Sequence, residues 1–206
     1  MKELIYDFFG YNEYIFVLIN TFCHKIGIEQ PLFFISKIFD IEKFAIYYIL
    51  VLLAGFIYIK NKNSKGFFFD FMMKLGTAYA SFGFAYAALK FSVNMQRPFC
   101  SLASDQFYTI ANISEERCLS SFPSSHTGLC FLILLFIWPY LSHFTKALGI
   151  SALLCVGLSR ISLAMHYPAD IIYSLLIAYL IYILSRRIYR IFKNNIFAWA
   201  RNIFIG

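Results

Sequence analysis

Two segments of the sequence carry residues that could act together on an anion. One holds two cations, and the other holds a cation with an imidazole–carboxylate pair. Lys90 and Arg97 are seven residues apart, about two helical turns, so a helix would present both on one face. His166 and Asp170 are four residues apart, a spacing at which a carboxylate can hold an imidazole ring. Arg160 precedes that pair. Three cations beside a histidine that can act as a nucleophile indicate chemistry on an anion such as phosphate.

A third segment, Phe122-Pro123-Ser124-Ser125-His126, has the composition of a helix N-terminus. Proline suits the first helical turn, and serine suits the cap. The free N–H groups and the positive end of the helix dipole there attract anions. A second histidine at this position can supply a proton. The sequence therefore predicts a phosphate pocket with two histidines and three cations.

Together the three segments resemble the signature motifs of the type-2 phosphatidic acid phosphatase superfamily in order and in spacing. The matching stretches read Lys90-x6-Arg97-Pro98, Pro123-Ser124-Ser125-His126 and Ser159-Arg160-x5-His166-x3-Asp170. They cover about 80 residues, from 90 to 170, and a helical bundle around them extends the resemblance to most of the chain. The resemblance implies an integral membrane lipid phosphatase.

The same resemblance assigns a role to each residue. His166 would attack phosphorus and form a phosphohistidine, and Asp170 would hold its ring. His126 would protonate the leaving oxygen and then activate water. No metal ion or other cofactor is implied, because positioned cations can stabilise the transferring phosphoryl group. The implied phosphate-binding residues are Lys90, Arg97, Ser124, Ser125 and Arg160.

One residue departs from the family pattern, which reads Pro-Ser-Gly-His in the second motif. Here Ser125 replaces the glycine. A serine would be strained if the position needs a positive φ, and tolerated if it lies in the first helical turn. Because the charged and acid–base positions are all present, we expect tolerance.

The composition is that of an integral membrane protein. Hydrophobic residues make up 60% of the 206 residues and charged residues 14%, with a mean hydropathy of +0.66. A soluble domain has about 45–50% apolar and 25% charged residues, so this composition excludes an ordinary soluble enzyme or a disordered chain. The net charge of +7 comes from residues grouped between apolar runs. That distribution argues against nucleic-acid binding.

Long apolar runs predict an all-α membrane bundle of five to six transmembrane helices in one domain. Residues 1–42 predict amphipathic helices at the interface, with a first span near 11–28 as the alternative. Residues 43–190 form the catalytic bundle, and 191–206 form a basic tail. We expect no cleaved signal peptide. The five clear spans are 43–59, 68–92, 124–142, 147–164 and 168–185.

Basic residues predict the orientation in the membrane. They cluster at 60–65, at Lys146 and at 186–201, all on one side, which is therefore cytoplasmic. The opposite side carries 93–123 and the turn 162–168. The predicted site thus faces the periplasmic or outer side of a plasma membrane, which is the inner membrane of a bacterium.

The cysteines indicate one possible disulfide. Cys100 and Cys118 both fall in the outer segment and can close a loop of about 19 residues if that side is oxidising. Such a bridge would contribute roughly 3 kcal/mol by loop entropy. Sequence alone does not fix the pairing. The remaining cysteines, Cys23, Cys130 and Cys155, lie in apolar runs as packing residues.

Three functions are compatible with these features. The first is a lipid phosphatase in a bacterial envelope, acting on undecaprenyl pyrophosphate or a lipid A phosphate, with phosphatidylglycerol phosphate next and phosphatidic acid also a family substrate. The second is a phosphotransferase that passes the phosphoryl group to a lipid acceptor. The third is a non-enzymatic anion transporter or scaffold. Internal repeats and mid-membrane cations are the features that would indicate this third function. The head group and the oligomeric state are left open.

Overall fold

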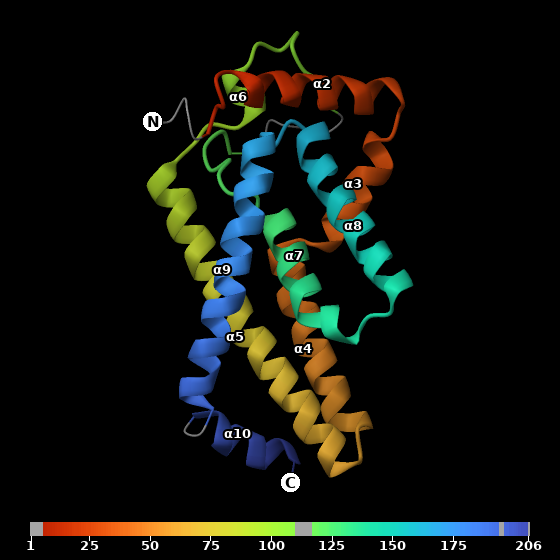
Figure 1. Cartoon of the computed structure of the whole chain (residues 1–206), viewed down its shortest axis with the longest axis vertical. Coiled ribbons are helices and arrows are strands. Elements are labelled where there is room, and N and C mark those ends of the chain that lie inside the picture. Colours follow the sequence, from red (N-terminus) through yellow and green to blue (C-terminus); the bar gives the residue numbers. More distant parts are fainter. Residues whose placement is uncertain (1–5, 110–116, 194–195, 206) are drawn as a thin grey trace.

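A computed structural model describes residues 6–109, 117–193 and 196–205, and every regular element in these residues is a helix. The predicted all-α bundle is confirmed. The long helices run roughly along the long axis of the molecule (Figure 1). They are α4 (Ile41–Tyr58), α5 (Lys62–Val93), α7 (Ser125–Ile137), α8 (His143–Ser162) and α9 (Pro168–Phe192).

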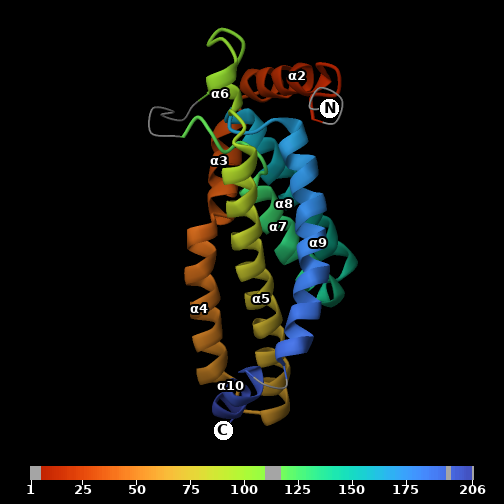
Figure 2. The same ribbon diagram turned by 90° about the vertical axis from the view of Figure 1, so that its left-hand side faces the viewer.

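The two ends of the bundle are covered by shorter helices that lie across the axis (Figure 2). Helix α2 (Tyr11–Lys25) crosses one end, and α10 (Ile196–Ile205) crosses the other. From α2 the chain turns into α3 (Glu29–Ile38), which leads to α4. The interfacial helix and its alternative, a span near 11–28, both stay predictions.

Length and apolar composition give fewer membrane crossings than the hydropathy of the sequence suggested. Among the described helices, α8 and α9 are long and apolar enough to cross, and α3 with α4 would form a third span broken by a bend of 50°. Helix α5 has 32 residues but carries Asp70, Lys74 and Lys90. Helix α7 is apolar but short, and it continues only through the 3-10 turn η2 (Trp138–Tyr140). A count of five to six spans stays a prediction.

The bundle core forms where α5, α7 and α9 meet, and it is built from interlocking apolar side chains. Tyr86 on α5 is 1% exposed and donates a hydrogen bond to the Ser174 carbonyl on α9, at 2.8 Å. Gly128 on α7 allows this, because a Cβ there would collide with the Tyr86 hydroxyl. The other buried members are Leu75, Ala78, Phe82, Leu129, Leu132, Phe136, Ala178 and Ile181.

The connection between α5 and α7 is tied back on itself. Cys100 in the short helix α6 (Pro98–Ser101) forms a disulfide with Cys118, with an S–S distance of 2.06 Å. Beside it the Arg97 N–H donates to the Cys118 carbonyl at 2.8 Å, and the Ser121 N–H donates to the Met95 carbonyl at 2.9 Å. The first and last parts of this connection therefore lie side by side, which places α7 next to the end of α5.

This disulfide predicts a thiol count that can be measured directly. Protein denatured without reductant should react with a maleimide at three of its five cysteines, and at all five after reduction. The Cys100→Ser/Cys118→Ser variant should react at three sites in both states and lose about 3 kcal/mol of stability, because the loop is no longer closed. Five reactive thiols in the unreduced wild type would contradict the bridge.

Candidate active site

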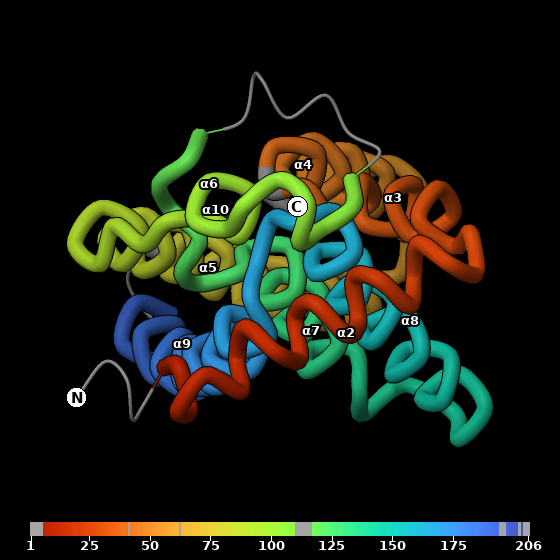
Figure 3. The backbone as a smooth tube through the Cα atoms, turned by 90° about the horizontal axis from the view of Figure 1, so that it is seen from above, coloured from red at the N-terminus to blue at the C-terminus, as the bar shows by residue number. Residues whose placement is uncertain are grey.

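The three sequence motifs meet at the end of the bundle that α2 covers. Helix α5 ends near there, α7 begins near there, and α8 gives way to α9 there (Figure 1). Seen from above, α2 lies across this end (Figure 3). Lys90, Arg97 and Arg160 all lie close enough to His126 and to His166 for their charges to act on both rings. The structure thus brings the predicted cations and histidines together.

His166, in the turn between α8 and α9, forms a buried pair with Asp170, in the first turn of α9. The two residues are 1% and 0% exposed, and His166 Nδ1 lies 3.5 Å from Asp170 Oδ2. The N–H groups of Met165 and His166 donate to the Arg160 carbonyl at 3.0 and 3.1 Å. The end of α8 therefore fixes the backbone that carries the imidazole.

The Asp170 carboxylate is held by three further donors. The Tyr167 N–H donates to Oδ2 at 2.9 Å, which caps the first turn of α9. The Ser121 hydroxyl donates to the same oxygen at 2.5 Å, and the Tyr6 hydroxyl donates to Oδ1 at 2.7 Å. A buried carboxylate is costly unless its lone pairs are satisfied, so these contacts explain how it stays in place.

The second motif leads into α7, with Pro123 before the helix and not in its first turn as predicted, and with no capping hydrogen bond from the Ser124 side chain. Ser124 is the N-cap, is fully buried, and donates its N–H to the Asp170 carbonyl at 3.4 Å. Its hydroxyl lies 3.0 Å from the Thr127 hydroxyl. Ser125 is the first helical residue, whereas positive φ angles occur at Ser120 and Ala164. Ser125 therefore has the backbone that a serine adopts without strain.

The cations are shielded from solvent and positioned by neighbouring backbone. Arg97 and Arg160 are each 8% exposed. Lys90 Nζ donates to the Ser120 carbonyl at 3.2 Å, and Arg97 Nη1 lies 3.1 Å from the Met165 sulfur. Burial chiefly, and then the charges of Arg160, Lys90 and Arg97, hold the pKa of His166 well below 6.5. Its ring is therefore neutral at pH 7, the state in which a ring nitrogen can attack phosphorus.

Two residues of this site escaped the sequence reasoning. Ser121 lies just before the second motif, and its place beside a helix N-terminus is the one local signal that could have indicated it. Tyr6 is 164 residues from Asp170, and no pattern in the sequence links the two. Within the described ranges, no group of three or more His, Cys, Asp or Glu side chains is arranged to hold a metal ion.

A cavity of about 580 Å³ lies between the C-terminal end of α5 and residues 117–120. It shares Lys90 with the site, and Arg117 also lines it. Its remaining lining is Ala87, Phe91, Asn94, Cys118, Leu119 and Ser120. A mainly apolar wall with two cations is suited to a lipid whose head group is anionic.

Comparison with known proteins agrees with this geometry. A family model described as the PAP2 superfamily matches residues 71–194. The crystal structure of Aquifex aeolicus LpxE superposes with a TM-score of 0.60 over 84% of this chain and 93% of that one. Its sequence is 21% identical, so this likeness shows the fold. None of the curated proteins compared with the chain matches it.

The lowered pKa of His166 predicts a dependence of stability on pH. In the unfolded chain His166 takes up a proton near pH 6.5, while the buried ring does not. The free energy of unfolding should therefore fall as pH decreases from about 7 to 5. Thermal unfolding in detergent should show a smaller fall in a His166→Gln variant. His143, which is exposed, provides the control, since His143→Gln should follow the wild type. Equal falls in wild type and His166→Gln would contradict the burial of a neutral ring.

Proposed function

The chain belongs to the PAP2 superfamily, and we propose that it is a membrane lipid phosphatase that works through a phosphohistidine on His166. The observation that carries this proposal is the buried His166 imidazole, which lies beside the Asp170 carboxylate and close enough to three cations for their charges to act on it. A neutral nucleophile facing a cluster of positive charge is suited to a phosphate ester, whose oxygens the cations can hold.

The proposed reaction has two steps. Binding of the anionic phosphate favours a protonated His126. Nε2 of His166 then attacks phosphorus, the bond from phosphorus to the leaving oxygen breaks, and His126 gives that oxygen its proton. Neutral His126 then takes a proton from water, which attacks the phosphohistidine and releases inorganic phosphate. Nδ1 of His166 has no hydrogen-bond partner in the free protein and lies 3.5 Å from Asp170 Oδ2; as the ring gains positive charge this contact should tighten, so that Asp170 accepts the Nδ1–H.

Lys90, Arg97 and Arg160 would hold the phosphoryl oxygens in both steps, with N–H groups of Ser124 and Ser125 at the start of α7. Fixed cations placed where negative charge develops lower the barrier without needing to reorganise. The proposal therefore includes no metal ion and no other cofactor, and it predicts activity that a chelator does not remove.

We place the chain in a bacterial inner membrane with five crossings: α4, α5, α7 with η2, α8 and α9. The site would lie at the outer interface under α2, and the C-terminus would be cytoplasmic. One feature supports the placement in a membrane, and a second supports the orientation. Large apolar side chains such as Ile49, Leu53 and Leu180 are exposed on the long helices. Basic residues, Lys60 and Lys193 among them, gather at the end opposite the site, as the positive-inside rule expects.

The cavity beside Lys90 supports a class of substrate. Arg117 provides a second cation near the phosphate-binding residues, in a wall that is otherwise mostly apolar. A lipid with a second phosphate would use both cations. We therefore favour undecaprenyl pyrophosphate or a lipid A phosphate, with phosphatidylglycerol phosphate next, as the substrate.

The proposal predicts phosphate release by purified protein in detergent with EDTA present. We would offer undecaprenyl pyrophosphate, lipid A, phosphatidylglycerol phosphate and phosphatidic acid, and measure inorganic phosphate. At least one lipid should be hydrolysed by the wild type. His166→Ala should lower the rate by 1,000-fold or more, the loss expected when a nucleophile is removed.

Ser125→Gly is the matched variant for the departure from the family motif. Because Ser125 already has helical backbone angles, glycine should change kcat/KM by less than about 3-fold. Release that appears only when a lipid acceptor is added would favour a phosphotransferase. A folded wild type that acts on none of these lipids, with or without an acceptor, would contradict the proposal.

A further inference from the structure

We propose that the N-terminal segment 6–25 completes the active site and that Tyr6 is a positioning residue, which holds Asp170 in the orientation that faces His166. This inference rests on the proposed function of the His166–Asp170 pair. Segment 6–25 lies outside residues 71–194, the part of the chain that the family model matches. The inference therefore concerns residues that the family model does not include.

The contact from Tyr6 is direct and well fixed. Its hydroxyl donates to Asp170 Oδ1 at 2.7 Å. Its ring packs edge-on against Phe122 and Tyr167, with centroids 6.1 and 6.5 Å apart. Burial and the neighbouring Asp170 charge raise the pKa of Tyr6, so the hydroxyl keeps its proton and remains a donor.

The two oxygens of Asp170 have different partners, and this gives Tyr6 its effect. Oδ2 faces His166 and accepts from Ser121 and from the Tyr167 N–H. Oδ1 accepts from Tyr6. The last torsion of an aspartate is broad, so the carboxylate can rotate when one side is not held. With both oxygens bonded, the orientation of Oδ2 toward the ring is fixed.

Helix α2 holds this segment on the turn that carries the pair. Asn12 Oδ1 accepts from the Ala169 N–H at 2.9 Å, and Asn20 Nδ2 donates to the Ser162 carbonyl at 2.8 Å. Both asparagines are buried, at 2% and 0% exposure. Phe16 between them packs against the Tyr167 ring at 5.4 Å. The α8–α9 turn is thus contacted just before and just after His166.

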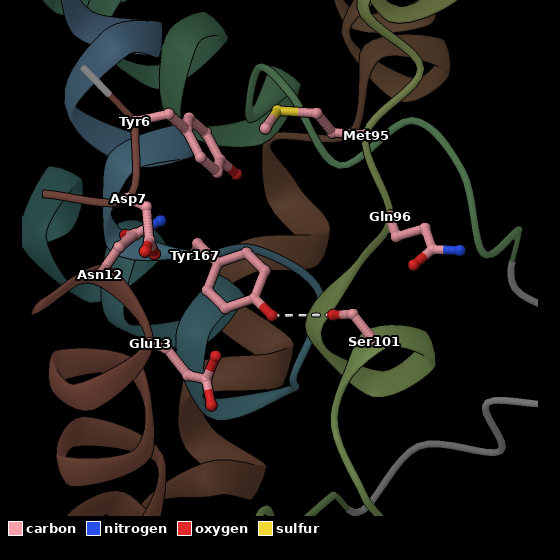
Figure 4. A pocket seen from close by; sticks show the side chains of 8 residues that line it. All are labelled: Tyr6, Asp7, Asn12, Glu13, Met95, Gln96, Ser101 and Tyr167. Carbon is pink, nitrogen blue, oxygen red and sulfur yellow. Dashed lines mark hydrogen bonds between the residues drawn. The ribbon is translucent and has the colours of Figure 1, made fainter. Parts of the chain in front are cut away.

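Farther along the segment, Asn20 also joins α2 to the connection after α5. Its Nδ2 donates to the Tyr108 carbonyl at 2.9 Å, and its Oδ1 accepts from the Tyr108 N–H at 2.7 Å. Near Tyr6, by contrast, a cavity of about 360 Å³ lies between the segment and residues 95–101 (Figure 4). The Tyr167 hydroxyl contacts Ser101 across it at 2.8 Å. A change at Tyr6 therefore acts first on Asp170, which its hydroxyl contacts directly.

The test is Tyr6→Phe in the full chain, because this variant keeps the ring and removes only the donor. In the phosphate-release assay kcat should fall roughly 10-fold, the effect of losing one hydrogen bond to a charged group. KM should stay within about 2-fold, since the change affects the nucleophile's partner and not the phosphate-binding cations. Tyr11→Phe is the matched control, because Tyr11 is 62% exposed on the same segment. It should behave as the wild type.

The pH profile separates positioning from a loss of structure. The titratable groups facing Asp170 are Tyr6, Tyr167 and His166, with Lys90 acting from α5. A carboxylate with one donor fewer is protonated more readily, so the acidic limb of kcat should move to higher pH in Tyr6→Phe. An unchanged kcat, or a raised KM at constant kcat, would overturn the inference. A lower kcat would also overturn it if the acidic limb of the pH profile stayed in place and the melting temperature fell, because that combination indicates a loss of structure.

A second readout needs no turnover and so separates this inference from the proposed function. The chain has four histidines, and a ¹⁵N-histidine spectrum of His166→Ala identifies the His166 signal. Tyr6→Phe should shift that signal, and Tyr11→Phe should not. If the wild type releases no phosphate, the proposed function fails, and the spectrum still decides whether Tyr6 acts on the pair. An unshifted His166 signal in Tyr6→Phe would overturn the inference.

Discussion

The buried charge of Asp170 is the constraint on which the end of the bundle covered by α2 depends. A carboxylate removed from water is tolerated only where donors replace its hydration. Here the donors are Tyr6 before α2, Ser121 before α7 and the Tyr167 N–H at the start of α9. Satisfying one side chain therefore joins three segments that are distant in sequence. The same contacts orient the oxygen that faces His166.

Charge balance explains why these residues suit a phosphate. Lys90, Arg97 and Arg160 with Asp170 leave a net charge of about +2 in the site when both histidines are neutral. A phosphate monoester near neutral pH carries a charge close to −2. Burying cations near one another is unfavourable in the free protein, and an anion relieves that repulsion. The three cations thus place positive charge where the phosphoryl oxygens would lie.

Local signals in the sequence predicted the motifs and the long helices, while contacts between distant segments were not predictable. Proline and serine at a helix start are local, so the beginnings of α7 and α9 agree with the predicted spans within a residue. Helix α8 begins at His143, earlier than predicted, because the Ser142 hydroxyl accepts from the Thr145 N–H and caps it. Tyr6 and Asp170, by contrast, come into contact through the packing of distant segments, and no periodic pattern in the sequence indicates that contact. The number of crossings is also hard to predict, because it depends on single charged residues and on bends in the helices. Hydropathy averaged over a window does not resolve either of them.

The most direct test of the account is to find the covalent intermediate. Wild-type protein would be mixed with a ³²P-labelled lipid substrate, quenched in alkali to preserve phosphohistidine, and digested with trypsin. The account predicts label on the peptide 161–186, whose one histidine is His166, and no label in His166→Gln. Label on another residue, or rapid hydrolysis with no labelled protein under any quench time, would contradict it.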